Sequence, residues 1–291
     1  MAALSSIMAG CQCASPLFLF RIRGRIRAKY GMKIVTWNVN SLKARLALVL
    51  EYLRTAKPDV ALLQETKCTD DSFPALEIEE LGYNIARHGQ KTYNGVAILS
   101  KYPMEDVRSG LPGDAADEQA RYIEAVISAP GRPVRVASIY APNGNPVDTQ
   151  KFDYKLQWLR RLNQHVKNLL PHEEALALGG DLNVILTEDD LYDPRAWEGD
   201  ALYRPESITA LRSILNLGLT DAYRACHTEP HRYTFWDYQA GAWAKDHGIR
   251  IDYLLLSPQA TDRLGACAID KHVRGWEKPS DHVPVWAEIG E

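Results

Sequence analysis

The sequence predicts an α/β protein in which layered sheets are covered by helices. Short apolar runs that fit strands alternate with amphipathic segments that fit helices, and the strands are in the majority. The chain has 291 residues, of which 46% are hydrophobic and 24% charged, an ordinary composition for a globular protein. No linker or low-complexity tract interrupts residues 32–291, so we predict a single domain over that range.

Strands are predicted where apolar and β-branched residues form short runs bounded by turn residues. The first run, 32–38, ends in a polar cluster, and the second, 58–65, ends on the carboxylate of Glu65. Further strands are expected at 95–100, 123–128, 134–140, 175–178, 250–256 and 283–289.

Helices are predicted where apolar residues recur with helical spacing, so that they share one face. One helix is expected to open at Asn38, and two longer ones to cover 149–170 and 205–217. The apolar face of the first would consist of Leu42, Leu46, Val49, Leu50 and Leu53.

Polar side chains able to hold a metal ion or a phosphate lie at the ends of five of these apolar runs. Taken singly, an Asn or Asp at a strand end fits a turn or a helix cap. In a layered fold, however, strand ends can converge at one edge although they are far apart in sequence. Their joint occurrence therefore favours a shared site. The side chains are Asn38, Glu65, Tyr140, Asp181 with Asn183, and Asp281 with His282.

The stretch GGDLNV, residues 179–184, interrupts what reads as a buried strand. Gly179 and Gly180 permit backbone angles and close approaches that side chains forbid. They can therefore deliver Asp181 and Asn183 to a strand end. A simple turn is the alternative interpretation.

Residues 1–31 differ from the rest of the chain. They hold five basic side chains and no acidic one, and these charges follow the uncharged stretch, the reverse of a secretory signal. We interpret this segment as an extension that is disordered or that precedes a natural start at Met32. Nothing else resembles a membrane span, and the five cysteines show no metal-type clustering, which suits reduced thiols in a cytoplasmic protein.

The chain resembles the exonuclease III and apurinic/apyrimidinic (AP) endonuclease family, in particular bacterial exodeoxyribonuclease III, within the endonuclease/exonuclease/phosphatase superfamily. Nine matching stretches occur in family order and cover nearly all of 32–291. They are KIVTWNVNSLKAR (33–45), LLQETKC (62–68), YNGVAILSK (93–101), IYAPNG (139–144), GGDLNV (179–184), GLTDAYR (218–224), YTFWDY (233–238), GIRIDYLLLS (248–257) and EKPSDHVPVW (277–286).

This resemblance implies a four-layer α/β sandwich, with two mainly antiparallel β-sheets packed face to face and helices on both outer faces. It also implies a DNA repair nuclease that hydrolyses phosphodiesters at abasic sites or 3′ ends of double-stranded DNA. The expected cofactor is Mg²⁺, with Mn²⁺ as the other possible ion. We expect a monomer with no membrane partner.

The resemblance also implies a metal site. Glu65 would be the principal ligand, with Asn38 and Asp281 nearby. Asp181 would orient or deprotonate the attacking water, or belong to a second metal site, since paired-metal mechanisms also serve phosphodiesters. The chemistry requires such groups whatever the family. An anionic phosphodiester repels hydroxide, so a hard cation with oxygen ligands must neutralise the phosphate.

The remaining catalytic positions would bind the scissile phosphate. Asn183 and Tyr140 would contact it, and His282, held by Asp252, would complete the phosphate site. Asn183 and His282 are also metal-ligand candidates. A lone histidine beside a strand is usually structural, but a carboxylate on another strand fixes the tautomer and favours the imidazolium.

Contacts to the DNA backbone are expected from four further side chains. Lys67 lies two residues beyond Glu65, on the same side of an extended strand, and would support the metal or a phosphate, unless it is simply solvated. Asn143 fits a phosphate contact or a turn before Gly144. Arg121 and Arg250 fit backbone contacts or surface ion pairs.

An apolar pocket for a base-free sugar is implied at Phe235, Trp236 and Ile251. Three apolar residues in strand-like segments are also what an ordinary core contains. Ile249 stands where certain abasic endonucleases have an aromatic wall, which puts the strength of the abasic-site preference in doubt.

Net charge limits how DNA can be bound. The whole chain carries −3, and residues 32–291 are more acidic still, so binding needs local positive surface. Carboxylates gathered at a metal site contribute to the negative count, and we expect modest, salt-sensitive binding.

Two other functions stay open. One is a phosphodiesterase or phosphatase of the same fold that acts on lipids or inositol phosphates, and the other is a non-catalytic DNA-binding module. The sequences around Glu65 (QETK) and Asp252 (RIDYLLLS) are typical of the DNA enzymes, and every expected site position holds the expected residue type. The nuclease interpretation is therefore favoured.

Overall fold

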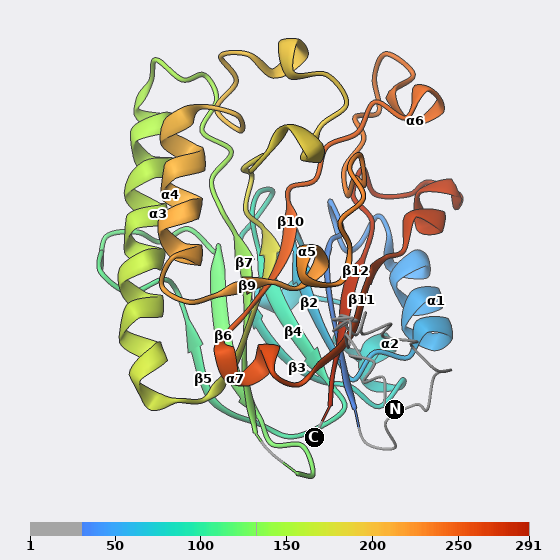
Figure 1. Ribbon diagram of the computed structural model, residues 1–291. Helices are drawn as coiled ribbons and strands as arrows, with labels where there is room; N and C mark the ends of the chain where they lie inside the picture. The colour runs from blue at the N-terminus through green and yellow to red at the C-terminus, as the bar shows by residue number, and fades with distance from the viewer. Residues whose placement is uncertain (1–30, 132, 291) are drawn as a thin grey trace, which may run out of the picture.

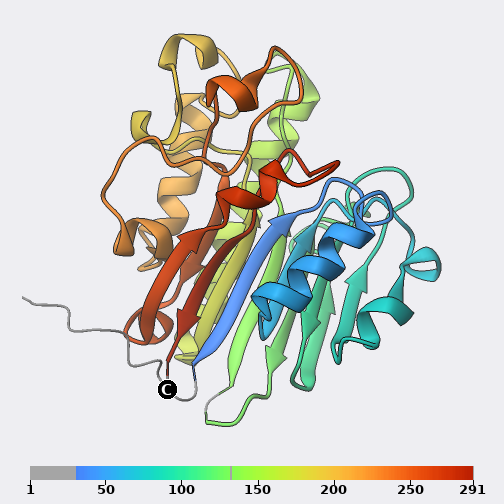
Figure 2. The same cartoon turned by 90° about the vertical axis from the view of Figure 1, so that its right-hand side faces the viewer.

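The computed structural model describes residues 31–131 and 133–290, and two six-stranded sheets form its centre. The sheets pack face to face, and helices lie outside each of them (Figures 1 and 2). The predicted four-layer α/β sandwich is confirmed. The extension expected at 1–31 lies, except for Gly31, outside the described residues.

The first sheet has the order β11-β12-β1-β2-β4-β3. Only the central pair, β1 and β2, is parallel, and its other neighbours are antiparallel. The strands are β1 Met32–Asn38, β2 Val60–Gln64, β3 Asn84–His88, β4 Val96–Ser100, β11 Leu264–Ile269 and β12 Val285–Ile289.

The second sheet has the order β5-β6-β7-β8-β10-β9 and repeats this arrangement. Its central pair, β7 and β8, is parallel, and the other neighbours are antiparallel. The strands are β5 Met104–Ser109, β6 Tyr122–Ile127, β7 Val134–Tyr140, β8 Ala175–Asp181, β9 Thr220–Asp221 and β10 Asp252–Leu256.

Helices connect the parallel pairs and cover the outer faces. On the first sheet, α1 (Leu46–Ala56) joins β1 to β2, and α2 (Ala75–Glu79) lies beside it. On the second sheet, α3 (Gln150–Leu169) joins β7 to β8 and packs with α4 (Pro205–Leu215). Shorter helices are α5 Ala222–Cys226, α6 Ala242–Lys245 and α7 Pro258–Thr261. Across the described residues, no helix is long and apolar enough to cross a membrane.

The helix predicted to open at Asn38 begins only at Leu46, which corrects that prediction. Asn40 and Ser41 have positive φ angles of 44° and 86°, which a helix does not permit. The backbone N–H groups of Ser41 and Leu42 instead donate to carbonyls at the end of β2. The turn after β1 is thereby fixed against the turn after β2, where site residues lie.

The glycine at position 179 of β8 is required by the close packing of the two sheets. A Cβ atom there would lie 2.6 Å from Leu62 Cδ1 and 2.9 Å from Leu254 Cδ2, so glycine permits the two sheets to approach closely. β8 continues through both glycines to Asp181, three residues beyond the predicted strand end. The carboxylate is therefore carried by a rigid strand and not by a turn.

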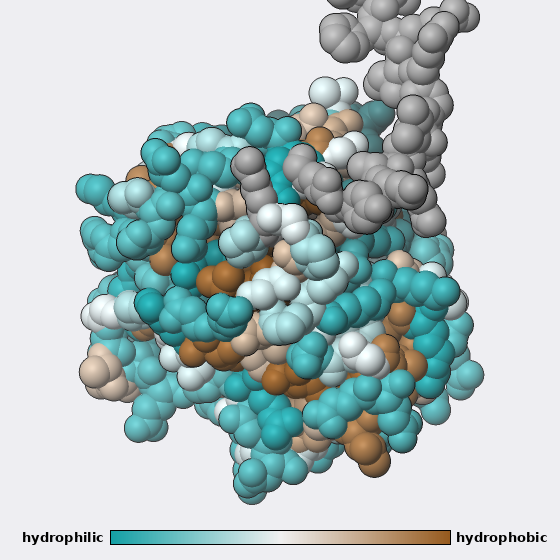
Figure 3. Space-filling view, turned by 90° about the horizontal axis from the view of Figure 1, so that it is seen from below, coloured by the Kyte–Doolittle hydropathy of each residue, from teal (hydrophilic) through white to brown (hydrophobic). Residues whose placement is uncertain are grey.

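The core between the sheets is apolar until the strands reach one end. There Gln64 Nε2 donates to Ser138 Oγ at 2.9 Å, and Ser138 Oγ donates to Leu63 O at 2.8 Å, a polar tie between the sheets. The opposite end, seen from below, has a mainly hydrophilic surface with scattered apolar areas (Figure 3).

Candidate active site

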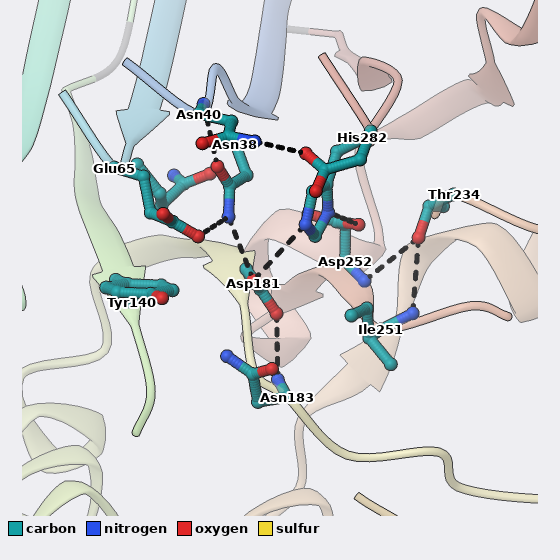
Figure 4. Close-up of polar contacts among 12 residues, drawn as sticks. Asn38, Asn40, Glu65, Tyr140, Asp181, Asn183, Thr234, Ile251, Asp252 and His282 are labelled. Atoms are coloured by element: carbon teal, nitrogen blue, oxygen red, sulfur yellow. Dashed lines mark hydrogen bonds and ion pairs between the residues drawn. The ribbon is translucent and has the colours of Figure 1, made fainter. Parts of the chain in front are cut away.

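The candidate site lies at one end of the central strands of both sheets (Figure 4). Asn38 ends β1 and Glu65 follows β2, while Tyr140 and Asp181 end β7 and β8. Asp181 is paired in register with Tyr140 on one side and with Asp252, the first residue of β10, on the other. The predicted convergence of strand ends is thus present in the structure.

Asn38 links the carboxylates that come from the two sheets. Its Nδ2 atom donates to Glu65 Oε1 at 2.8 Å and to Asp181 Oδ2 at 3.0 Å. Its Oδ1 atom accepts from the Asn40 backbone N–H at 3.0 Å, and its backbone carbonyl accepts from Ser280 Oγ at 2.8 Å. The fully buried amide is therefore held in one orientation.

Three side chains form a group that fits a metal ion. Glu65, Asp181 and His282 each offer one ligand atom, and these atoms all lie within 4.8 Å of one another. Two carboxylates in such a group suit a hard divalent cation. Asp281 lies outside this group, since its Oδ1 accepts from Asn40 Nδ2 at 3.0 Å and from Ser280 Oγ at 3.3 Å.

Lys67 contacts the Glu65 carboxylate directly. Its Nζ lies 2.7 Å from Glu65 Oε2 and donates to Asn40 Oδ1 at 2.5 Å. The backbone is not the extended strand that we expected, because Glu65 and Lys67 have φ angles of 52° and 51°. Burial opposes ionisation of Glu65, but the Lys67 charge and the Asn38 hydrogen bond lower its pKa.

His282 is held between two aspartates, as the sequence predicted for Asp252. Its Nδ1 lies 2.8 Å from Asp252 Oδ2, and its Nε2 lies 3.7 Å from Asp181 Oδ2. Burial disfavours the charged ring, yet Asp252 and then Asp181 raise the pKa of His282 well above its ordinary range. The imidazolium is therefore the form expected at neutral pH.

Asp181 and Tyr140 have raised pKa values for related reasons. Burial raises the pKa of Asp181, opposed by His282 and reinforced by the nearby Asp252 and Glu65 carboxylates. Burial, Glu65 and Asp181 raise the pKa of Tyr140, so that its phenol stays neutral and can donate. Because its pKa is raised, the Asp181 carboxylate can take up a proton near neutral pH.

Three other predicted residues line the same region. Asn183 donates its backbone N–H to Asp181 Oδ1 at 2.9 Å, and Asn143 Nδ2 lies 3.4 Å from Asn183 Oδ1. The Arg121 guanidinium lies 4.8 Å from the Tyr140 ring centroid. These positions suit phosphate contacts beside the carboxylates.

The residues predicted to form an apolar pocket separate into two clusters. The Phe235 ring lies 4.9 Å from that of His282, and Phe235 packs against the buried cluster that contains Ile251 and Ile249. Trp236 is fully buried in a different cluster, and its Nε1 donates to Asp246 Oδ1 at 2.9 Å. The prediction that Trp236 lines a sugar pocket is wrong, because Trp236 is a core residue.

Arg250 is also misassigned by the sequence prediction. It is only 1% exposed, its Nε lies 2.7 Å from Asp190 Oδ1, and its Nη1 lies 2.7 Å from Asp221 Oδ2. A side chain enclosed by two carboxylates does not reach DNA, so the predicted DNA contact is wrong. The alternative of an ion pair holds, but the pairs are buried and not at the surface. It anchors the segment that contains Asp190 to the end of β10.

Three residues of the site were not predicted from the sequence. Asn40 and Ser280 hold Asn38 and Asp281, and Thr234 Oγ1 accepts from the backbone N–H groups of Ile251 and Asp252 at 3.2 Å each. The only signal for the first two was their place beside Asn38 and Asp281 in the sequence.

Comparison with known proteins agrees with this geometry. The endonuclease/exonuclease/phosphatase family model matches residues 35–282. Exodeoxyribonuclease III of Haemophilus influenzae is 31% identical over 266 residues, 89% of this chain and 100% of that protein.

Two solved structures have the same fold and substantial sequence identity. An AP endonuclease from Archaeoglobus fulgidus is 36% identical with a TM-score of 0.84, covering 89% of this chain and 99% of the other. A 3′ phosphatase from Neisseria bound to a product DNA hairpin is 39% identical with a TM-score of 0.85, covering 89% and 100%. The chain therefore belongs to the endonuclease/exonuclease/phosphatase family, in the group of exodeoxyribonuclease III and the AP endonucleases.

Proposed function

We propose that this protein is a metal-dependent DNA repair nuclease that hydrolyses phosphodiesters at abasic sites or 3′ ends of duplex DNA. One observation carries the proposal: Glu65 and Asp181, from different sheets, share the Asn38 amide and lie beside the Asp252-bound His282. Anion-binding and proton-accepting groups are thus brought to one place.

Glu65 and Asp181 would hold the metal ion, with Mg²⁺ as the proposed ion and Mn²⁺ as a substitute. His282, as an imidazolium, lies beside the ion and is left to bind the phosphate. When bound, the ion supplies positive charge that neutralises the phosphate and the departing oxygen. Lys67 keeps Glu65 ionised and so available as a ligand.

The protein's own side chains supply the remaining chemistry. The His282 imidazolium, the neutral Tyr140 phenol and the Asn183 amide donate hydrogen bonds to phosphate oxygens. Asp181 accepts a proton from the attacking water, a role that its raised pKa favours. Asp252 does not touch the substrate but keeps His282 protonated and oriented.

The names of the relatives support DNA as the substrate. They include an exodeoxyribonuclease, an AP endonuclease and a 3′ phosphatase bound to a DNA hairpin.

A labelled duplex assay tests the proposal. With Mg²⁺ we expect incision at a single abasic analogue and shortening of a recessed 3′ end, and chelation should abolish both. Glu65→Ala and Asp181→Asn should remove most turnover without unfolding the protein. The exposed Lys167 on α3, replaced by Met, is the matched control.

The assay also separates the alternatives. Cleavage of sphingomyelin or inositol phosphates with DNA left intact would favour the lipid phosphodiesterase. A folded protein that binds duplex DNA but never cuts it with Mg²⁺ or Mn²⁺ would contradict the nuclease proposal.

A further inference from the structure

Lys155 is a fully buried lysine on the inner face of α3, close to the candidate site. Its Nζ donates to three backbone carbonyls, those of Asn143 at 2.9 Å, Asn183 at 2.5 Å and Ala201 at 3.2 Å. Within the described part of the chain, it forms no salt bridge with a carboxylate. An ammonium has three N–H donors, so three carbonyls satisfy it completely.

The three carbonyls belong to three separate connections. Asn143 follows β7, Asn183 follows β8, and Ala201 lies in the segment that leads into α4. The side chains of Asn143 and Asn183 contact each other, and the Asn183 N–H donates to Asp181 Oδ1. Lys155 therefore holds, from behind, the backbone that carries two proposed phosphate contacts.

The residues next to Lys155 leave space for its side chain and hold the Ala201 segment beside it. A Cβ atom on Gly144 would lie 2.6 Å from Lys155 Cδ and 3.2 Å from Ala201 Cβ, and Gly144 has a φ of +92°. Only glycine leaves room for the lysine stem at that position. Asn145 adds a second tie, since its Nδ2 donates to the Asp200 carboxylate and its Oδ1 accepts from the Ala201 N–H at 3.1 Å.

We infer that Lys155 is a positioning residue of the nuclease site, which fixes Asn143 and Asn183 against the phosphate and couples them to the segment around Ala201. The inference rests on the proposed function. Lys155 acts through these residues and does not touch the substrate. Burial lowers the pKa of Lys155 to about 7, but the three carbonyl acceptors favour the ammonium, which has three N–H donors and forms stronger hydrogen bonds than a neutral amine.

Lys155→Met is the direct test. Methionine fills a similar volume but leaves buried carbonyls without their donor. We expect kcat for abasic-duplex cleavage to fall on the order of 10–100-fold, as for other groups that orient ligands from behind, while KM for the duplex changes little. A wild-type kcat would overturn the inference.

Ser207→Ala is the matched control. Ser207 is also fully buried, and its Oγ donates to the same Ala201 carbonyl at 2.7 Å, but it does not hold Asn143 or Asn183. We expect it to keep nearly the wild-type kcat. If Ser207→Ala loses as much kcat as Lys155→Met, the effect is general loop packing and the inference fails.

A double-mutant cycle tests the route through Asn183. In an Asn183→Ala background, Lys155→Met should cost much less in kcat than it does in the wild type, because the residue it positions is gone. Additive effects would overturn the inference. If Lys155→Met does not fold, as judged by circular dichroism, Lys155→Gln replaces it, since glutamine keeps two donors.

Hydrogen exchange gives a readout that does not depend on activity. In the Lys155 variant, segments 141–146 and 182–187 should exchange faster than in Ser207→Ala, and equal exchange would overturn the inference. A wild-type protein that cuts none of the DNA substrates would instead overturn the proposed function. The two failures are thus distinguishable.

Discussion

The Asp252–His282 pair sets the charge that the site presents to a phosphate. Asp252 is fully buried, and one of its oxygens contacts His282 Nδ1 while the other has no hydrogen-bond partner in the described structure. An unpaired buried carboxylate would be costly, so the pair favours the imidazolium strongly. His282 is therefore expected to remain a cation throughout the neutral range.

Replacing Asp252 by Asn should move the pH dependence of cleavage. Asp252 raises the pKa of His282, so its loss lowers that pKa, and the ring loses its proton at a lower pH. We expect the alkaline fall of kcat/KM to shift towards acid, together with a loss of kcat. A pH–rate profile measures both.

Asp262→Asn is the control for that profile, because Asp262 is exposed and lies in the turn after α7. Its profile should match the wild type. An Asp252→Asn profile with an unmoved alkaline limb would mean that His282 is not the group that titrates there.

At the same scale, sequence reasoning located acidic residues well and buried cations poorly. Glu65 and Asp181 could be predicted because they follow apolar runs whose ends converge in a layered fold. Arg250 and Lys155 could not be placed correctly, because their burial depends on carboxylates and carbonyls from distant segments. Only the position of Lys155 among apolar residues of α3 hinted at its burial.

At the scale of elements, the central strands were predictable and the edge strands were not. β7 matches its predicted bounds, and α3 lies within one residue of its own, with Thr149 as its N-cap. β5 was missed because most of its residues are exposed, so that it has no apolar run. The edge strand β9 has only two residues, and β3 (NIARH) has only two apolar ones, so neither forms an apolar run. β11 (LGACAI) was missed although its residues are apolar, because glycine and alanine favour strands only weakly.

Gly179→Ala tests the close approach of the two sheets. The added Cβ would lie 2.6 Å from Leu62 Cδ1 and 3.1 Å from Thr36 Cβ, so neighbours in a packed core must move. We expect a loss of about 1–3 kcal/mol in the free energy of unfolding, measured in urea. Gly275→Ala is the control, since nothing lies within 4 Å of its Cβ position. Equal stability of both variants would contradict the packing argument.

Asp190→Asn tests the anchor that Arg250 provides. Burial opposes ionisation of Asp190, but Arg250 and Arg224 lower its pKa. The ion pair between Asp190 and Arg250 therefore stabilises the fold fully above the ordinary aspartate pKa of about 4. This contribution is lost as the pH falls through the lowered pKa. At pH 7 we expect the variant to be less stable by about 3–5 kcal/mol. The difference should shrink below about pH 4. A pH-independent difference would point to lost packing instead.

At the scale of the whole molecule, the site is a junction between two sheets. The parallel pair at the centre of each sheet ends at the same edge (Figure 2). Glu65 of one sheet therefore lies near Asp181 of the other, with Asn38 between them (Figure 4). Two carboxylates held this close repel each other when both are ionised. Lys67 and the His282 imidazolium offset part of this repulsion, and the Glu65 pKa is lowered. Without a metal ion, it is therefore the ionised Asp181 carboxylate that opposes the stability of the fold.

This opposition predicts how stability responds to metal and pH. Burial raises the pKa of Asp181 to about 7, above its ordinary value, so the metal-free fold loses stability as pH rises from about 4 towards 7. Asp181→Asn should therefore melt at a higher Tm than the wild type at pH 8 in chelator. Mg²⁺ should raise the wild-type Tm, because a ligand that binds only the folded state adds about 2.7 kcal/mol to the free energy of unfolding at 100 times its Kd. Mg²⁺ should raise the Tm of Asp181→Asn much less. Equal Mg²⁺ shifts in both proteins would show that the ion does not join the sheets at Asp181.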